Sequence, residues 1–403
     1  MKILLYSWQA NNENVLAENF GKLGHEVLWF QKECRHYTRD MELAVEMIPF
    51  IHGKGIEAVV SFNYFPIISM ICDTCKIPYY AWVYDCPHFT LYAKAVMQPC
   101  NHIGVFDRAM AERLAQCGVS AVRHVPLAVD TEYFEKKTGQ AKGEESAKYQ
   151  CDISFVGSLY TDEHNYYAVI AGEAEENAEA GQAADALIKR QMFCYDVDYL
   201  KKAVNDGELD TQHFLIQMER QGLLLGEDYF AKPEEILLAA VLEKQVTVEE
   251  RRAMLLAVDQ WIRAQDNRNM SFHLYTASDL SGMPELKRWH KGTVDYHEQM
   301  PNVFHESRIN LNLSLRSIHT GIPLRVLDIM ACGGFVLTNR QQELAEAFRE
   351  DHEIVMFDSM EDGMEKIAYY LSHETERRAI AEAGRKKVRE CFSYAQGIRR
   401  LMR

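Results

Sequence analysis

The sequence predicts an α/β protein with two parallel-sheet domains, and three observations lead to this fold class. Short apolar segments alternate with amphipathic helical segments over two long parts of the chain. A polar stretch without apolar periodicity, from Glu135 to Gln150, separates these parts. The length of 403 residues suits two cores better than one. Strands that alternate with helices in this way form parallel sheets with right-handed crossovers.

The first predicted domain covers residues 1–136. Gly24 and Gly118 stand where helices are expected to end, because glycine readily adopts the left-handed conformation that closes a helix. The expected strands are residues 2–8, 27–30, 57–65, 78–85, 102–107 and 121–129. The expected helices are residues 13–24, 40–54, 66–75 and 108–118.

The second predicted domain follows a linker at residues 137–150 and covers residues 151–390. A helix-rich stretch of about residues 162–265 interrupts it, with few strand signals. The expected strands are residues 151–160, 270–279, 308–317, 333–339 and 352–359, and residues 292–307 continue the alternation. Two such sheets leave a cleft at the carboxyl ends of both sets of strands, where α/β proteins bind ligands.

Composition excludes several classes of function. A formal charge of −15 argues against nucleic acid and against an anionic membrane surface as main partners. No apolar stretch approaches the length of a membrane span, and the first residues, which turn polar early, predict a strand rather than a signal peptide. The ten cysteines lack framework spacing, and Cys72 and Cys75 form the only C-x-x-C pair, so reduced thiols in a cytoplasmic protein are expected. The oligomeric state stays open.

The run GIPLRVLDIMACGG, from Gly321 to Gly334, is the most informative segment. It follows an alternating strand and predicts an amphipathic helix with Pro323 in its first turn. Arg325 and Asp328, three residues apart, fall on one face of that helix. A helix N-terminus with an arginine suits an anion, and a carboxylate one turn further suits neighbouring hydroxyls. This pattern favours a nucleotide or nucleotide-sugar site, whereas the alternative is a plain surface pair.

Other strand ends of the second domain add weaker signals. Gly157 and Ser158 close its first strand, where a backbone N–H can approach a diphosphate. Main-chain groups from Val294 to Tyr296 stand where a base edge would be bound, and an ordinary loop is an equal alternative there. The chain has no G-x-G-x-x-G and no P-loop motif, and no D-x-D of the kind that holds a metal against a diphosphate is expected. Charge neutralisation is therefore expected from helix ends and cations, Arg325 first and Arg316 second, with no metal.

In the first domain, polar residues follow two apolar strands. Asn63 and Tyr64 end one strand on the expected acceptor side, and Asp85 ends the next, shortly before His88. A carboxylate at such a position can act as general base toward an acceptor hydroxyl, and His88 can assist or replace it. The structural alternative for Asp85 is a turn or helix-capping role, which is common for Asp before Pro.

The chain resembles two-domain glycosyltransferases of the GT-B type, and its second half resembles more narrowly the CgeB-like, spore-protein-like glycosyltransferase family. The first half resembles the uncharacterised amino-terminal domain that often precedes that family. The segments that carry the resemblance are CDISFVGSLY, VDYHEQMPNVFHESRINLNLSLRSIHTGIPLRVLDIMACGGFVLTNRQQEL, the closing helical YYLSHETERRAIAEAGRKKVRECFSY, VVSFNYFPIIS, IPYYAWVYDCPHFTLY and HVPLAVDTEYF.

The resemblance implies a GT-B architecture with two Rossmann-like domains that face each other across a cleft. It further implies a nucleotide-diphosphate sugar on the second domain, an acceptor on the first, and no catalytic metal or other cofactor. Arg325 would contact the diphosphate and Asp328 the ribose, while Gly157, Ser158 and Gly321 would allow close backbone approach. A terminal helix, in residues 391–403, would cross back to the first domain.

One position departs from the family pattern. Retaining relatives carry two glutamates eight positions apart, and here the second is Asp328 and the first is Thr320. The loss of the first carboxylate leaves retention or inversion of configuration open, and His319 next to it could contact the donor sugar or its phosphate. The hypothesis is sugar transfer from a nucleotide-diphosphate donor to a hydroxyl-bearing acceptor, which could be a glycan, a protein or a small molecule. The alternative is a catalytically silent GT-B-like protein that binds a nucleotide or a partner.

Overall fold

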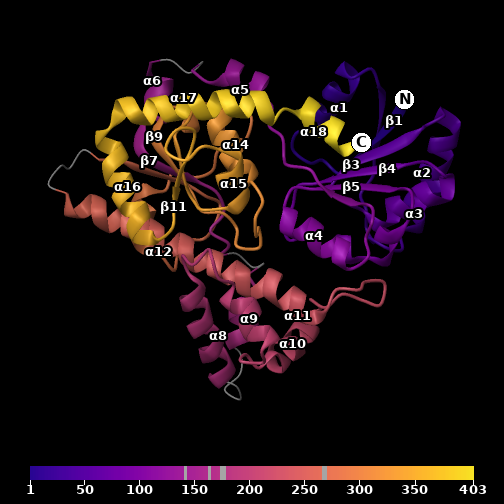
Figure 1. Cartoon of the computed structure of the whole chain (residues 1–403), viewed down its shortest axis with the longest axis horizontal. Helices are drawn as coiled ribbons and strands as arrows, with labels where there is room; N and C mark the ends of the chain where they lie inside the picture. Colours follow the sequence, from indigo (N-terminus) through magenta and orange to yellow (C-terminus); the bar gives the residue numbers. More distant parts are fainter. Residues whose placement is uncertain (140–142, 162–164, 173–177, 266–269) are drawn as a thin grey trace.

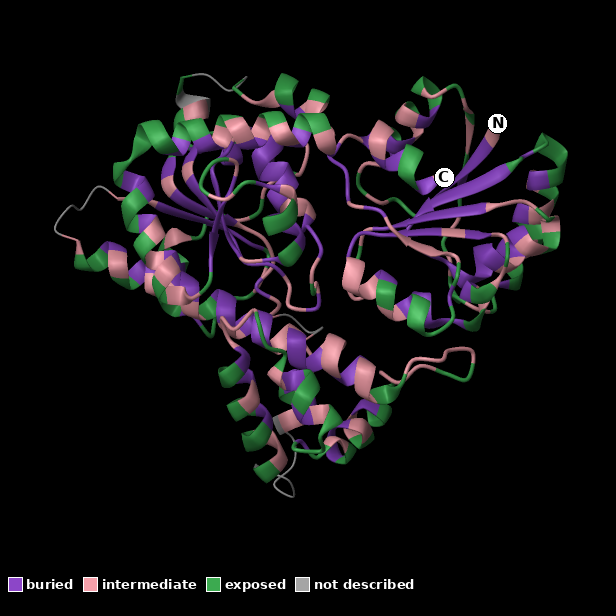
Figure 2. Ribbon diagram, viewed as in Figure 1, coloured by how far each residue is buried: buried purple, intermediate pink, exposed green. Residues whose placement is uncertain are grey.

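The computed structural model describes residues 1–139, 143–161, 165–172, 178–265 and 270–403. Two α/β units stand side by side, and a group of helices from the middle of the chain lies below them (Figure 1). In both units the strands are largely buried between helical layers (Figure 2). The expected alternation of strands and helices is confirmed in both halves of the chain.

The first unit contains a parallel sheet in the order β2-β1-β3-β4-β5-β6. Its strands are β1 (Lys2–Ser7), β2 (Glu26–Gln31), β3 (Ala58–Phe62), β4 (Tyr79–Val83), β5 (Asn101–Val105) and β6 (Val122–His124). The connecting helices are α1 (Glu13–Lys22), α2 (Met41–Lys54), α3 (Pro66–Cys75) and α4 (Arg108–Gln116), with the 3₁₀ turns η1 (Phe89–Tyr92) and η2 (Lys94–Met97). β3 and β4 are buried along their whole length because helices cover both faces of the sheet.

The second unit contains a parallel sheet in the order β11-β10-β9-β7-β8. Its strands are β7 (Cys151–Val156), β8 (Phe272–Tyr275), β9 (Ser307–Asn312), β10 (Val336–Asn339) and β11 (Val355–Phe357). Its helices are α13 (Met300–Glu306), α14 (Leu324–Ala331), α15 (Gln342–Ala347), α16 (Met360–Ser372) and α17 (Glu374–Cys391), with the 3₁₀ turn η4 (Pro284–Trp289). The helix predicted in the run from Gly321 to Gly334 is thus present as α14, directly after the loop that follows β9.

The helical group lies between β7 and β8 in the sequence. Its elements are α7 (Tyr167–Gly172), α8 (Ala178–Gln191), α9 (Tyr199–Asn205), α10 (Thr211–Arg220), α11 (Pro233–Ile236), η3 (Leu237–Leu242) and α12 (Glu243–Ala264). These helices build a hydrophobic core of their own around Phe214 and Val241. They also touch the first unit, because Arg113 of α4 pairs with Glu235 at 2.6 Å. Residues 162–164 and 173–177 of the expected insertion lie outside the described residues.

Several expected elements differ from the structure in their bounds, and most of the expected strands are shorter. The strand expected at residues 121–129 ends at His124, because Pro126 lacks the N–H that a further ladder bond needs. The segment 137–150 that was predicted to be a linker contains the short helix α6 (Glu144–Ala147), and the helix α5 (Thr131–Lys137) ends at its first residue. Residues 140–142 of that segment lie outside the described residues.

The chain returns to the first unit at its carboxyl end. α17 runs along the second unit, and α18 (Tyr394–Leu401) packs on the first (Figure 1). Ile398 and Leu401 enter a hydrophobic cluster with Trp82 of β4 and with Val125. Gly397 faces the indole of Trp82 so closely that a Cβ would overlap the ring. Within the described ranges, no helix is both long enough and apolar enough to cross a membrane.

Candidate active site between the two sheets

The two units meet through loops that follow strands. Cys86, after β4, donates its thiol hydrogen to the carbonyl of Ser317 at 3.0 Å, and Ser317 lies in the loop after β9. Asp107, after β5, accepts the backbone N–H of His319 at 2.6 Å. The carboxyl ends of both sheets therefore face each other, which is the arrangement that places ligands in open α/β folds.

Asp85 occupies the first-unit side of this interface as an exposed carboxylate. The side chain of Asn63 fixes it, because Nδ2 donates to Asp85 Oδ2 at 2.6 Å. Oδ1 of Asn63 accepts the backbone N–H groups of Tyr84 and Asp85 at 3.0 and 3.2 Å. Asn63 is itself buried and has a φ of +60°, a conformation that asparagine tolerates better than most residues. A buried amide thus holds an exposed carboxylate at the end of β4.

His88 and Tyr64 take structural positions beside Asp85. His88 Nε2 accepts the backbone N–H of Tyr64 at 3.1 Å, so the ring proton resides on Nδ1. Burial lowers the pKa of His88 and keeps the ring neutral, although Asp85 acts in the opposite direction. Tyr64 was expected on the acceptor side, yet its side chain is fully buried and lies against Tyr79 in the core. The left-handed turn at Asn63 directs the next side chain into the sheet's own packing.

A cavity of about 590 Å³ adjoins Asp85. It is bounded by the loop after β1, the end of β2, and the ends of β3 and β4. Asn63 and His88 line it together with Asp85, so three of the four first-unit site residues predicted from the sequence share one cavity. Its volume lies in the range of small-molecule sites.

On the second unit, α14 presents Arg325 and Asp328 as the spacing predicted. Their side chains form an ion pair at 3.4 Å, but Asp328 is only 1% exposed, which excludes a surface pair. Asp328 Oδ1 accepts the hydroxyl of Tyr296 at 2.9 Å, and Asn12 of the first unit donates to that hydroxyl at 3.3 Å. The carboxylate is therefore linked across the interface in this closed arrangement.

Burial dominates the electrostatics of Asp328. It raises the pKa of the carboxyl from 3.8 to about 6, while Arg325 and the Tyr296 hydrogen bond oppose the rise. The side chain of Arg325 also contacts Met300 and lies over the ring of Phe304. A buried carboxylate with few donors gains from additional hydroxyl donors, and ribose offers two of them.

The end of β7 carries Gly157 and Ser158. A Cβ at Gly157 would meet only ring carbons of Phe155 at 3.6 Å, so internal packing does not require glycine there. Ser158 Oγ lies 3.2 Å from Ser278 Oγ, and its carbonyl accepts Arg251 Nη1. Arg251 of α12 is buried and also donates to the carbonyl of Leu313 at 2.6 Å, so it ties the ends of β7 and β9 together. A buried cation thus stands at the strand ends where a diphosphate was expected.

Arg316 and His319 turn toward the helical group instead. Arg316 donates to the carbonyls of Gln191 and Cys194 and pairs with the buried carboxylate of Glu250 at 3.6 Å. His319 pairs with Glu243 at 2.9 Å, and this carboxylate raises the pKa of the imidazole to about 9. His319 is therefore cationic at neutral pH. Both residues line a cavity of about 890 Å³ between the helical group and the second sheet.

The loop before α14 is held by the first unit. A Cβ at Gly321 would come within 2.9 Å of Asp107 Cα, so glycine permits close approach of the two units at that point. Thr320 Oγ1 lies 3.0 Å from Asp107 Oδ1 and 2.9 Å from Glu343 Oε1. Position 320 carries no carboxylate of its own, but the carboxylate of Glu343 lies next to it.

Part of the chain matches a known sequence family. Residues 227–403 match the sequence family described as glycosyl transferase-like. The matched region contains β9, α14 and α18, but it does not reach the first sheet. A search of curated proteins found no match.

Solved structures align over the whole chain. A glycosyltransferase from Rickettsia africae superposes with a TM-score of 0.54 and 12% identity, over 100% of this chain and 96% of its own. HepE from Anabaena in complex with UDP-glucose superposes with a TM-score of 0.52 and 9% identity, over 100% of this chain and 98% of its own. Sucrose-phosphate synthase from Thermosynechococcus elongatus superposes with a TM-score of 0.50 and 11% identity, over 100% of this chain and 98% of its own. The fold is GT-B. The predicted fold class is confirmed.

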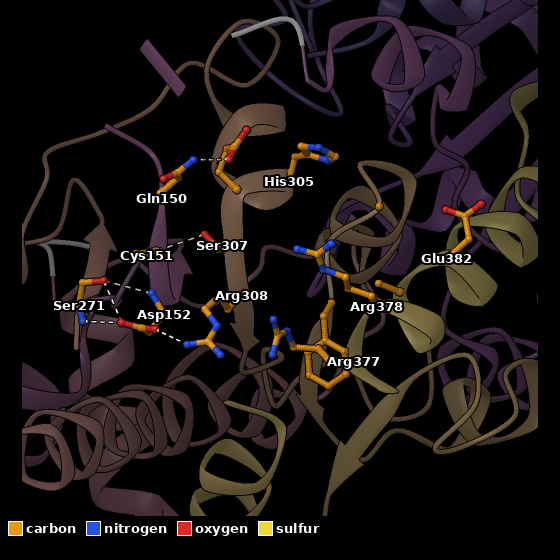
Figure 3. Close-up of a pocket in the computed structure, with 14 residues that line it drawn as sticks. Gln150, Cys151, Asp152, Ser271, His305, Ser307, Arg308, Arg377, Arg378 and Glu382 are labelled. Carbon is orange, nitrogen blue, oxygen red and sulfur yellow. Dashed lines mark hydrogen bonds and ion pairs between the residues drawn. The ribbon is translucent and has the colours of Figure 1, made fainter. Parts of the chain in front are cut away.

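A further cavity, of about 770 Å³, lies at the opposite edge of the second sheet (Figure 3). Arg308 and Arg377 line it from β9 and α17, and Arg308 pairs with Asp152 at 2.8 Å. This cavity adjoins the amino ends of β7 and β9. Ligands of open α/β sheets bind at the carboxyl ends of the strands, whereas this cavity lies at their amino ends.

Sequence reasoning missed three residues of the interface. Asn12 bonds to Tyr296, Arg251 joins two strand ends, and Glu243 pairs with His319. Arg251 and Glu243 belong to α12, whose residues show helical periodicity but no signal of where the helix docks. Glu250 and Arg251 are both buried, but this burial is visible only in the structure and not in the sequence.

Proposed function

We propose that the protein is a glycosyltransferase that moves a sugar from a nucleotide-diphosphate donor to a hydroxyl group of an acceptor, without a catalytic metal. The observation that carries the proposal is the contact between the loop with Asp85 and the loop before α14. The second of these loops lies in the region that matches the glycosyl transferase-like family. The resemblance of the second half to CgeB-like enzymes and of the first half to their amino-terminal domain belongs to the same proposal.

The donor would lie on the second unit. Asp328 would accept the ribose hydroxyls once the Tyr296 hydroxyl turns away from it. Arg325 in the first turn of α14 and Arg251 at the ends of β7 and β9 would stabilise the diphosphate. Opening of the interface at Asn12 and Tyr296 would admit the nucleotide, and closure would exclude water.

The chemical step is a direct displacement at the anomeric carbon. The acceptor oxygen forms a bond to that carbon, the bond from the carbon to the diphosphate oxygen breaks, and the electron pair leaves with the nucleoside diphosphate. Asp85 takes the proton of the acceptor hydroxyl. Such a displacement inverts the anomeric configuration, which NMR of the product reports.

The test is turnover with a panel of nucleotide sugars. UDP-glucose is the first donor, because HepE, which shares the fold, was solved with it. The expected result is release of free nucleoside diphosphate, and this release should continue in the presence of EDTA. A panel in which no donor is bound or consumed would contradict the proposal, and turnover that EDTA abolishes would contradict metal independence.

Nucleotide-sugar binding should weaken in acid because Asp328 must be ionised to accept ribose hydroxyls. With the pKa of the carboxyl near 6, affinity for UDP-glucose is expected to fall roughly tenfold from pH 7.5 to pH 5.0. The diphosphate of UDP-glucose does not titrate in this range, so the effect reports on the protein. Isothermal titration calorimetry across the pH range measures it.

Asp328→Asn is the matched control, because the amide keeps the shape and does not titrate. Its affinity is expected to be lower at pH 7.5 and nearly independent of pH. In the ligand-free protein, the pKa of the Asp328 carboxyl is higher in the folded state than in the unfolded chain, so the protonated group stabilises the fold. This stabilisation is fully present below pH 3.8 and is lost as the pH rises through about 6. Asp328→Asn should therefore also raise Tm at pH 7.5. A steep pH dependence retained in the variant would assign the titration to another group.

A further inference from the structure

The cavity beside Asp85 has the chemistry of a carbohydrate site, and we infer that it binds a neutral saccharide as the acceptor of the reaction. This inference rests on the proposed function and narrows the class of acceptor, because the sequence is compatible with a glycan, a protein or a small molecule. The cavity of about 590 Å³ takes the end of a saccharide chain. A folded protein surface does not enter a concave site of this size.

Aromatic rings form one wall of the cavity. Trp8 is 38% exposed and Tyr37 is 48% exposed, and both line the cavity with the buried ring of Phe65. The ring centroids of Trp8 and Tyr37 lie 6.4 and 6.0 Å from that of Phe65. Exposed aromatic rings that gather in one cavity, unlike rings scattered singly over a surface, are typical of a binding site. One face of a pyranose consists of C–H groups, which pack against such rings.

The ring of Trp8 and the backbone of Tyr37 are held in place. Trp8 Nε1 donates to the carbonyl of Phe62 at 2.9 Å, which fixes the indole on the end of β3. The carbonyl of Tyr37 accepts the N–H of Ile67 at 2.7 Å, which anchors its backbone to the start of α3. A fixed aromatic surface loses little conformational entropy when a ligand binds. The rings are therefore suited to recognition.

The polar groups of the cavity include amides and the carboxylates of Asp85 and Glu33. Gln9 and Gln31 line it together with Asp85, and each offers hydrogen bonds to hydroxyl groups. Lys32, a cation of the lining, is paired with Glu46 at 2.5 Å. Burial keeps His88 neutral by lowering its pKa. The cavity offers aromatic rings, amides and two carboxylates, and its lysine is already paired. This lining favours an uncharged polyhydroxyl ligand over a phosphorylated one.

Within this cavity the reacting hydroxyl of the saccharide would face Asp85. The hydroxyl oxygen bonds to the anomeric carbon of the donor, its proton passes to Asp85, and the diphosphate leaves with the electron pair of the broken bond. Trp8 and Tyr37 do not touch the reacting atoms. They position the acceptor, so their loss should act on acceptor KM rather than on donor binding.

The experiment measures release of nucleoside diphosphate with p-nitrophenyl glycosides of glucose, galactose, mannose and N-acetylglucosamine as acceptors. We expect at least one glycoside to stimulate release. Trp8→Ala should then raise the KM for that glycoside about tenfold, the size of one aromatic contact, and leave the KM for the donor unchanged. Trp29→Ala is the matched control, because Trp29 is 41% exposed on β2 and does not line this cavity.

Two outcomes would overturn the inference. In one, only serine- or threonine-containing peptides stimulate release and no glycoside does. In the other, Trp8→Ala and Tyr37→Ala leave the glycoside KM as it is in Trp29→Ala. Neither outcome affects the proposed function, which fails instead if the protein neither binds a nucleotide sugar nor releases nucleoside diphosphate. Saturation-transfer NMR of the glycosides without donor gives a direct readout of saccharide binding.

Discussion

Asp85→Asn is expected to lower kcat by roughly 10²- to 10⁴-fold, the usual contribution of a positioned general base. The amide has the shape of the carboxylate but takes no proton. Asn63 can still hold the side chain through Oδ1, so the loop after β4 keeps its conformation. Steady-state release of nucleoside diphosphate with acceptor measures the loss, and calorimetry should show unchanged affinity for the donor.

Glu33→Gln provides the control for this variant, because Glu33 is a second carboxylate that lines the same cavity. Its kcat should stay within about twofold of the wild-type value, since nothing assigns Glu33 a proton-transfer role and surface substitutions have small effects. An Asp85→Asn enzyme that keeps more than a tenth of its kcat would show that another group, or solvent, takes the proton. His88 would then be the next residue to test.

Gly397→Ala is expected to destabilise the protein by about 3 kcal/mol or more, although the same change in an exposed helix stabilises by up to about 1 kcal/mol. The added methyl group would overlap the indole of Trp82, and that ring is fully buried on β4. α18 must shift away or leave the first unit. Urea unfolding measures the change, and limited proteolysis at the chain's carboxyl end reports release of α18.

Gly53→Ala is the matched substitution, because Gly53 lies in α2 and a Cβ there meets no atom within 4 Å. Its stability should be unchanged or slightly higher, as helix propensity predicts. Equal loss of stability in both variants would mean that the contact with Trp82 is not the cause. The pair separates packing from propensity within one chain.

The local pattern was sufficient for the elements but not for their contacts. Arg325 and Asp328 could be placed on one helix face because their spacing is set within a single helix. The depth at which Asp328 lies could not, since it depends on Tyr296 and Asn12, which are distant in the sequence. Tyr64 was misplaced because one residue with positive φ precedes it, and a strand pattern does not reveal such a residue.

Some predicted site residues of the second unit contact other partners than expected, for a similar reason. Arg316 follows β9 as a phosphate-binding cation would, but Glu250 and two carbonyls of the helical group hold it. The insertion has helical periodicity throughout, and periodicity carries no information about the surface on which a helix docks. Long-range partners therefore account for most of what the sequence left undetermined at the interface.

The position of α18 has a consequence for biosynthesis. Residues of α18 complete the apolar cluster around Trp82, whereas the strands β1, β3 and β4 of that cluster leave the ribosome long before α18 does. At typical translation speeds, the interval between β6 and α18 is roughly 10–60 s. During that time the face of the first sheet that α18 covers stays open to water and to chaperones. The first unit therefore reaches its final packing only after the second has been synthesised.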